Sequence, residues 1–243
     1  MGTAAVREKG KRDFVTEADL ASQQAIEKIL TTAFPDHRFL GEEDDPALDK
    51  SVMPQDDSES PYCWVVDPLD GTTNFVHQLP SFSVSIGLLH NGVSVVGVVW
   101  DPVLEELYHA TSGGGAFKNG QPISVSDCDA IDRAMVIISF AKGVRRDDEQ
   151  VQQFLNLLEE AGTIRRLGSA ALNLCYVASG CSDSYWANNL KVWDIAAGSL
   201  IATEAGATIK KLDGQPLDLL KPNFFCAANE KLFQQGQQVL TVG

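Results

Sequence analysis

The sequence has few of the residues on which several common protein chemistries depend. Lys and Arg number 19 against 33 Asp and Glu, which gives a formal net charge of −14. Such a chain is not expected to bind nucleic acid, because phosphate backbones are bound by clustered Lys and Arg. The histidines are equally sparse and are scattered at His37, His77, His90 and His109. This scarcity disfavours zinc hydrolase and phosphohistidine chemistry.

Long apolar segments are also missing. No run approaches the roughly 20 residues that a membrane-spanning helix needs, and the N-terminal MGTAAVREKGKRDF lacks the apolar core of a secretory signal. The cysteines are odd in number, show no metal-ligand spacing and lie mostly in apolar stretches: Cys63, Cys128, Cys175, Cys181 and Cys226. We therefore expect reduced core thiols in a cytoplasmic protein that has no membrane partner.

What is present is typical of a globular protein, with 44% hydrophobic and 21% charged residues in a chain of 243. The first half predicts a helix at 17–33, strands at 38–40 and 63–66, and an acidic surface loop at 44–61 between them. Residues 82–111 alternate around a turn at 90–92, which predicts an antiparallel meander.

The second half alternates strand and helix patterns, which is typical of an α/β arrangement. Strands are predicted at 134–139, 163–167, 183–186, 208–211 and 224–227, and helices at 148–161, 169–179, 193–204 and 230–240. No linker separates the halves, so we expect one domain, 1–243, with sub-halves 1–128 and 129–243 that form one rigid body with a cleft between them.

The most informative stretch is residues 64–75, which read WVVDPLDGTTNF. An apolar run ends in Asp67, Asp70 follows three residues later, and Gly71 opens a turn into a predicted helix. This order places hard oxygen ligands beside backbone N–H groups that can hold an anion. It predicts a magnesium-dependent phosphoryl site.

Further acids stand at the boundaries of predicted elements, where a fold can gather side chains from distant segments. Glu42 and Glu43 follow a short strand, Asp194 opens a helix of small residues, and Asp19 lies near the start of the first helix. Each has a purely structural alternative. Asp70 and Asp194 could cap helices, Asp19 could be a first-turn acid, and Glu42 could be a loop carboxylate. For Glu43 we favour a place in solvent or behind the metal ligands over direct metal binding.

Four segments together resemble the inositol monophosphatase family of magnesium-dependent, lithium-sensitive phosphatases: DFVTEAD (13–19), GEE (41–43), WVVDPLDGTTNF (64–75) and WDIAAG (193–198). The similarity continues in GVV (97–99), GAFKNG (115–120), GSAALNLCYVASG (168–180) and EAG (204–206). The resemblance implies hydrolysis of a small phosphomonoester such as inositol 1-phosphate. Together with the pattern of elements it implies a layered α–β–α–β–α sandwich, and it also implies a homodimer.

The resemblance also assigns metal ligands for two to three Mg²⁺ ions. Glu42, Asp67 and the backbone carbonyl of Leu69 would bind the first ion. Asp67, Asp70 and Asp194 would bind the second, with Asp67 bridging the pair. Glu42 would help to hold a looser third ion through water.

The same resemblance implies how the substrate is held and attacked. The amides of Gly71 and Thr72 would take phosphate oxygens, Glu42 and the Thr72 hydroxyl would activate the attacking water, and Asp19 would orient Thr72. The implied substrate-binding positions are Asp70, Gly71, Thr72, Gly168, Ser169, Ala170, Ala187 and Asp194.

Two departures from the family pattern bear on function. Ala187 stands where inositol-specific members carry a glutamate, so the alcohol half of the substrate stays open, and Asn188 or Asn189 could replace the lost contact. Histidinol phosphate, fructose 1,6-bisphosphate and nucleotide 3′-phosphates remain alternatives, as does a non-catalytic binding protein on the same scaffold. Members usually carry a helix ahead of DFVTEAD; the given sequence lacks it, and we expect reduced stability with activity retained.

Overall fold

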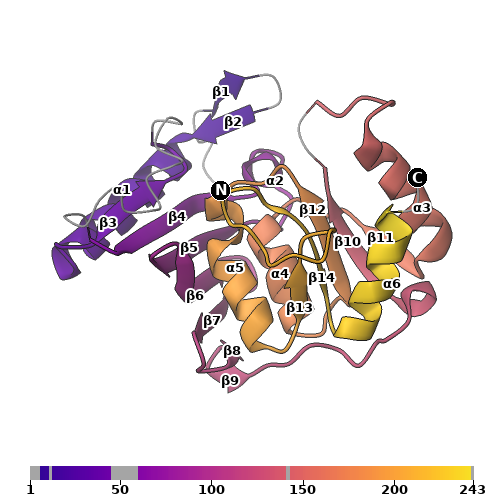
Figure 1. The fold of residues 1–243 in the computed structure, drawn as a ribbon. Helices are drawn as coiled ribbons and strands as arrows, with labels where there is room; N and C mark the ends of the chain where they lie inside the picture. The colour runs from indigo at the N-terminus through magenta and orange to yellow at the C-terminus, as the bar shows by residue number, and fades with distance from the viewer. Residues whose placement is uncertain (1–5, 11–12, 45–59, 141–142, 242–243) are drawn as a thin grey trace.

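The computed structural model describes residues 6–10, 13–44, 60–140 and 143–241, with side chains from Thr16 onward. Two main sheets and the helices around them form the alternating layers that the sequence predicts (Figure 1). The acidic loop predicted at 44–61 lies almost entirely outside the described residues. Within them, no helix has the length and apolar character needed to cross a membrane.

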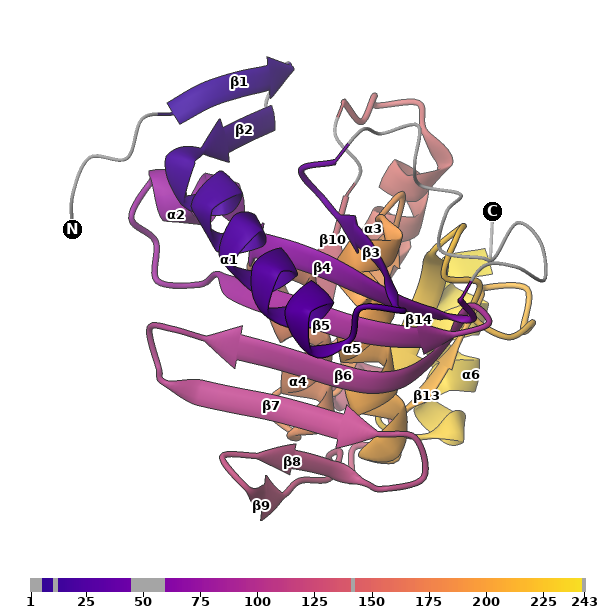
Figure 2. The same cartoon turned by 90° about the vertical axis from the view of Figure 1, so that its left-hand side faces the viewer.

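The chain begins with an antiparallel strand pair that the sequence did not predict, β1 (Val6–Gly10) and β2 (Asp13–Thr16), and runs directly into α1 (Glu17–Ala33). Thr16 and Asp19 form a capping box that starts the helix. The Thr16 hydroxyl accepts from the backbone N–H of Ala18 and Asp19, while the Asp19 carboxylate accepts from the backbone N–H of Thr16. Helix α1 packs on β4 at the outer face of the first sheet, as Figure 2 shows.

The first sheet has seven strands in the order β3-β4-β5-β6-β7-β8-β9. All neighbouring strands pair antiparallel except β3 and β4, which pair parallel. The strands are β3 (Arg38–Gly41), β4 (Tyr62–Asp70), β5 (Ser83–His90), β6 (Val93–Asp101), β7 (Glu106–Thr111), β8 (Ala116–Lys118) and β9 (Gln121–Pro122). The predicted meander is therefore confirmed and extends by two short strands.

The second sheet has five strands in the order β11-β10-β12-β14-β13. Its elements are β10 (Met135–Ser139), β11 (Thr163–Arg165), β12 (Ser184–Asn188), β13 (Thr208–Lys210) and β14 (Asn223–Ala227). Strands β10, β11 and β12 are parallel, and β14 pairs antiparallel with both of its neighbours. The carboxyl ends of the three parallel strands therefore share one edge of the sheet.

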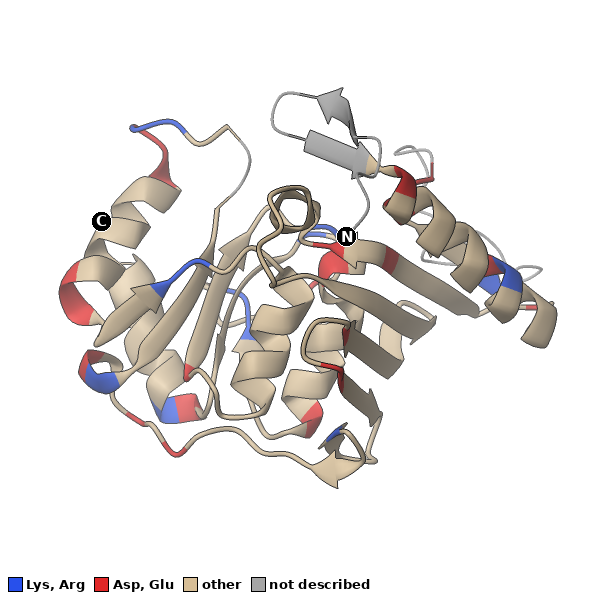
Figure 3. Cartoon of the chain, turned by 180° about the vertical axis from the view of Figure 1, so that it is seen from behind, with Lys and Arg blue, Asp and Glu red and all other residues tan. Residues whose placement is uncertain are grey.

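Helices α4 (Ala170–Ala178) and α5 (Val192–Glu204) lie between the two sheets, whereas α3 (Glu149–Glu160) and α6 (Glu230–Thr241) cover the far face of the five-stranded sheet. A short α2 (Thr72–Val76) and a 3₁₀ turn at Ile131–Arg133 complete the described elements. Helix α4 has no charged residue, and the charges of α5 are near its two ends (Figure 3). Apolar surface on every side suits the central layer of a sandwich.

Small residues let α5 approach the first sheet closely. A Cβ atom added at Gly87 would lie 2.9 Å from the Cβ of Ala196, and one added at Gly97 would lie 2.6 Å from the carbonyl oxygen of Ala197. Contacts of this length are shorter than side-chain packing allows, so both strand positions require glycine. This close packing fixes the N-terminal end of α5, and Asp194 with it, relative to the first sheet.

One expectation about the core is wrong for part of the cysteine set. Cys63, Cys175 and Cys226 are buried, Cys128 is half-buried, and Cys181 is exposed; all five are free thiols. Cys181 follows Gly180 directly after α4, in the turn that leads to β12, and the apolar stretch around it in the sequence belongs to α4 rather than to the turn.

Candidate active site

A β-bulge at the end of β4 creates the centre of the site. Asp67 pairs with Ser85 and Asp70 with Ser83, so three steps along β4 correspond to two steps along β5. Residues three apart on a regular strand point to opposite faces of the sheet, and one extra residue in a bulge cancels that difference. Both carboxylates thus reach the same side, where Asp67 is 1% and Asp70 is 6% exposed.

Asp194 joins these two acids from the first turn of α5. One oxygen from each of Asp67, Asp70 and Asp194 lies within 4.8 Å of the others. Asp194 also accepts from the backbone N–H of Lys191 at 2.6 Å, so it caps α5 while facing the other two acids. Among the described residues, these three form the one cluster of His, Cys, Asp or Glu with this proximity.

The electrostatics of the cluster call for a cation. Burial, followed by the charges of Glu42, Asp70 and Asp194, raises the pKa of Asp67 well above its ordinary value. Burial also raises the pKa of Asp70, although its hydrogen bonds act in the opposite direction. Carboxylate oxygens held together in a buried place suit a hard divalent cation, which removes their mutual repulsion. The donor set therefore fits magnesium.

Asp70 does not cap the helix that its structural alternative named. The N-cap of α2 is Gly71, and no side chain caps this helix, so the alternative in which Asp70 caps residues 72–75 is excluded. The Asp70 carboxylate instead accepts from the Ser169 hydroxyl at 2.5 Å and from the backbone N–H groups of Ala170 and Ala171 at 3.0 and 2.7 Å. These bonds place the start of α4, with the predicted turn at 168–170, directly against the cluster.

Thr72 and Asp19 meet beside the cluster although 53 residues separate them. The Thr72 Oγ1 atom lies 3.2 Å from Oδ1 of Asp19 and 3.1 Å from the carbonyl oxygen of Leu69. A hydroxyl has one proton, so it donates to one of these acceptors at a time. The second oxygen of Asp19 is held by the backbone N–H and the hydroxyl of Thr16 at 2.8 and 2.5 Å, which fixes the carboxylate.

The remaining predicted positions divide into two groups. Glu42 is half-buried directly after β3, and its charge is among the causes that raise the pKa of Asp67. Gly71 adopts φ 95°, the left-handed conformation that glycine favours, and α2 begins directly after it without a side-chain cap. Ala187, by contrast, is 0% exposed and packs in the core, so contact of its side chain with a substrate stays a prediction.

The replacement of the lost glutamate by Asn188 does not fit the strand geometry. Ala187 belongs to the core on the α4/α5 side of the sheet, whereas Trp186 belongs to the core on the α3/α6 side. Side chains alternate along a strand, so Asn188 projects to the α3/α6 side, away from the face of Ala187. Asn188 and Asn189 both line a separate hollow on that side.

Two supporting residues escaped sequence reasoning. Asn74 donates to the carbonyl oxygens of Ser81 and Leu167, both at 2.7 Å, and so joins α2 to the loop that precedes α4. Ser83 lies 3.4 Å from Asp70 and 3.2 Å from Ser169, hydroxyl to carboxylate and hydroxyl to hydroxyl. Asn74 lies inside the motif at 64–75, but no pattern in the sequence points to Ser83.

The chain is similar to known proteins over most of its length. The model of the inositol monophosphatase family matches residues 2–240. The chain is 44% identical over 215 residues to the chloroplastic phosphatase IMPL1 of Arabidopsis thaliana. The matched residues cover 85% of this chain and 55% of that protein. It is 40% identical over 237 residues to an inositol-1-monophosphatase of Synechocystis, covering 97% and 79%.

A third relative has a double name. The fructose-1,6-bisphosphatase/inositol-1-monophosphatase of Aquifex aeolicus is 38% identical over 215 residues, covering 87% of this chain and 76% of that protein. Among solved structures, an IMPase/NADP phosphatase in complex with Mg²⁺ and phosphate superposes with a TM-score of 0.85 at 27% identity, covering 99% of this chain and 87% of that one.

The layered fold and the acid cluster define a metal-dependent phosphatase. The chain belongs to the inositol monophosphatase family and is accordingly a phosphoric monoester hydrolase.

Proposed function

We propose that this chain is a Mg²⁺-dependent phosphomonoesterase that hydrolyses inositol 1-phosphate or a related small polyol or sugar phosphate. The observation that carries the proposal is the convergence of Asp67, Asp70 and Asp194, whose oxygens lie within 4.8 Å of one another. The solved relative with Mg²⁺ and phosphate supports the choice of metal.

The acids would hold two to three ions. Glu42, Asp67 and the Leu69 carbonyl would ligate one, and Asp67, Asp70 and Asp194 another, with Glu42 helping to hold a weaker third. Bound there, Mg²⁺ would offset the charge of the phosphate dianion and make a water molecule easier to deprotonate.

The protein itself would position the attacking water and the phosphate. Thr72, held by Asp19, would direct its hydroxyl oxygen toward the water, and Glu42 would accept the water's proton. The amides of Gly71 and Thr72 at the start of α2 would hold phosphate oxygens. The water oxygen would form a bond to phosphorus while the bond to the alcohol oxygen breaks in line with it.

The alcohol half of the substrate is the open part of the proposal. Asp70, Asp194 and the turn Gly168-Ser169-Ala170 surround the position where it would lie, and Ala187 supplies no carboxylate to a ring hydroxyl. A charge-assisted hydrogen bond is worth about 1.5–3 kcal/mol, so its absence predicts weaker selection for inositol. Fructose 1,6-bisphosphate is a specific second candidate, supported by the double name of the Aquifex relative.

A substrate panel tests the proposal. Phosphate release is measured with inositol 1-phosphate, fructose 1,6-bisphosphate, histidinol phosphate and adenosine 3′,5′-bisphosphate, each with Mg²⁺ and with EDTA, and Asp67→Asn serves as the inactive control. We expect Mg²⁺-dependent release from at least one monoester, with inhibition by lithium. A protein inert across the panel would instead support a non-catalytic binding role.

Two further proposals come from the family and the composition. We propose a homodimer, which light scattering of the purified chain tests directly. We also propose a cytoplasmic location, which fractionation of the native cells would test.

A further inference from the structure

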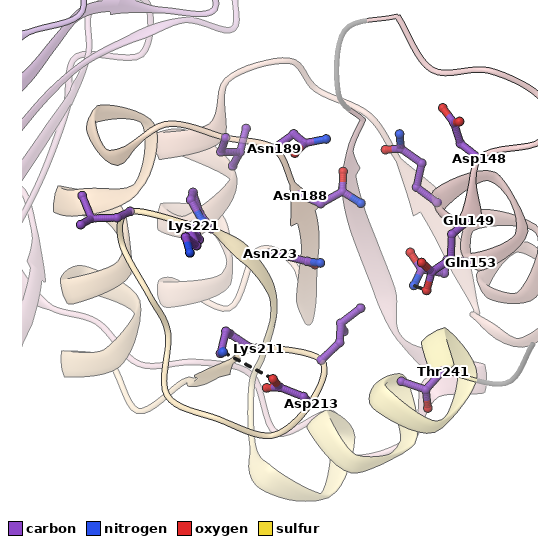
Figure 4. A pocket seen from close by; sticks show the side chains of 15 residues that line it. Asp148, Glu149, Gln153, Asn188, Asn189, Lys211, Asp213, Lys221, Asn223 and Thr241 are labelled. Atoms are coloured by element: carbon purple, nitrogen blue, oxygen red, sulfur yellow. Dashed lines mark hydrogen bonds and ion pairs between the residues drawn. The ribbon is translucent and has the colours of Figure 1, made fainter. Parts of the chain in front are cut away.

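A second hollow lies apart from the acid cluster, on the opposite face of the five-stranded sheet. Its volume is about 820 Å³, and it opens between α3, the end of β12, the segment that follows β13 and the segment that leads into β14 (Figure 4). None of the metal-ligand or catalytic positions described above lines it. The volume falls within the range of small-molecule sites, which are roughly 300–1,000 Å³.

A buried acceptor without a partner faces this hollow. Asn188 is 9% exposed, and no donor among the described residues reaches its Oδ1 atom. Figure 4 shows its amide directed toward the side chains of α3. Gln150 also lines the hollow, and its buried Oε1 has no hydrogen-bond partner in the part of the chain that the structure describes. Unpaired buried acceptors are costly and rare in folded proteins, so this pair points to a ligand that supplies donors.

The charges around the hollow restrict the ligand. Three described acids line the hollow, Asp148, Glu149 and Asp213, against two described lysines, Lys211 and Lys221. Lys211 is already paired with Asp213 at 3.4 Å. An anion would therefore meet an excess of carboxylate. Among the described residues of the hollow, no three acids have oxygens within 4.8 Å of one another, the proximity that the acid cluster shows.

The apolar part of the lining restricts the ligand further. Leu190, Leu212, Leu220 and Pro222 supply aliphatic surface, and no aromatic side chain contributes to the lining. A planar base or aromatic ring would lack a stacking partner. A saturated ring can place its C–H faces on this surface and its hydroxyls on the amides, where each hydroxyl both donates and accepts.

We propose that this hollow binds an uncharged polyhydroxylated ring, a cyclitol or a monosaccharide. A ring hydroxyl donates to Asn188 Oδ1, and Lys221 at the rim donates to another ring oxygen. This site is separate from the catalytic one, and its occupancy does not depend on the proposed hydrolysis.

The test uses the whole 243-residue chain with Mg²⁺ and measures binding of myo-inositol and D-glucose by saturation-transfer NMR and calorimetry. Asn188→Leu removes the buried acceptor in a side chain of similar size, and Asn188→Asp keeps an acceptor there. Lys221→Ala changes an exposed residue and cannot disturb the core, and Lys28→Ala on α1 is its matched control. Asp67→Asn reports whether the polyol binds at the acid cluster instead.

We expect wild type to bind at least one of the two polyols in the millimolar range, and Asn188→Leu to weaken binding at least roughly tenfold. Lys221→Ala weakens it severalfold, while Asn188→Asp, Lys28→Ala and Asp67→Asn bind as wild type does. Absence of binding to either polyol overturns the proposal. So does a Lys221→Ala variant with unchanged affinity, which remains informative if Asn188→Leu fails to fold, or loss of binding in Asp67→Asn.

Discussion

Asp70 on β4 accepts a 2.5 Å hydrogen bond from the Ser169 hydroxyl at the start of α4, 99 residues further along the chain. This hydrogen bond joins a candidate metal ligand on the first sheet to the helix layer that lies between the two sheets. Ser169 is 0% exposed and also accepts from the backbone N–H of Leu172, so it is the N-cap of α4. One hydroxyl thus starts a helix and orients a carboxylate.

Replacement of Ser169 by alanine should therefore affect both stability and activity. The loss of an N-cap and of a hydrogen bond to a charged group predicts a fall of about 1–3 kcal/mol in the free energy of unfolding. We expect kcat to fall as well, because Asp70 loses its shortest hydrogen bond. Ser179→Ala at the other end of α4 is the matched control, with a change within about 0.5 kcal/mol. Denaturant melts and steady-state kinetics provide the measurement, and equal effects of the two variants would contradict this role.

Asp67→Asn should separate stability from function. Burial and three neighbouring acids raise the pKa of Asp67, so its ionisation at neutral pH costs folding free energy when no cation is present. Asparagine removes that charge, and we expect a higher Tm than wild type in EDTA. Mg²⁺ should stabilise wild type and leave the variant nearly unchanged. Loss of Asp67, the proposed bridging ligand, should lower kcat/KM at least roughly 10³-fold.

Asp101→Asn is the control for this experiment, since Asp101 is also 1% exposed. Its carboxylate accepts from the backbone N–H groups of Val103 and Leu104 in the turn after β6, and it is not one of the three clustered acids. This variant should lower Tm equally with and without Mg²⁺. A lower Tm for Asp67→Asn in EDTA would show that repulsion among the acids is not the dominant effect.

Thr72→Val tests the hydroxyl that lies 3.2 Å from Asp19. Positioned proton-transfer groups contribute roughly 10²–10⁴-fold to rates, so we expect kcat to fall at least roughly 10²-fold with little change in KM. Thr72→Ser keeps the hydroxyl and should retain most of the activity. The neighbouring Thr73 is exposed, and Thr73→Val should behave as wild type. If Thr72→Val kept full activity, the attacking water would have to be positioned by other groups.

The cysteines should react with a thiol reagent in two distinct phases. At pH 8, Cys181 should react rapidly in the folded protein because it is exposed, and Cys181→Ser should abolish the fast phase. Cys63, Cys175 and Cys226 should react only after unfolding. Burial raises the pKa of Cys63 from 9.0 to about 11, which leaves almost no thiolate at pH 8.

The same shift predicts how stability depends on alkaline pH. The pKa of Cys63 is higher in the folded state, so the neutral thiol contributes to the free energy of unfolding. This contribution is fully present below about pH 9 and is lost as pH rises through about 11. Replacement of Cys63 by alanine should flatten this part of the stability curve, at the cost of a small cavity. A denaturant series between pH 8 and 11 measures it, and parallel curves for the two proteins would exclude Cys63 as the source.

The helices and strands of this chain follow from local patterns, and most were predictable for that reason. The apolar alternation of residues 82–101 depends only on which side chains face the core, and it predicted β5 and β6 within a residue or two. Helix α5 was also predicted, because a run of small and apolar residues after an acid is typical of a buried helix with an acidic first turn. The strand pair β1–β2 was missed because it lies beyond the residues with a clear pattern.

The sequence by itself determined the family, the order of the elements and the four segments that carry acids, because those features depend on residues that are close together in the chain. Only the tertiary structure decided how the acids meet. The bulge that turns Asp67 and Asp70 to one face, the choice of α4 as the helix that Asp70 caps, and the projection of Asn188 away from Ala187 all depend on pairing with strands distant in sequence. Pairing partners and strand register are set by the packing of the whole chain, and no local pattern encodes them.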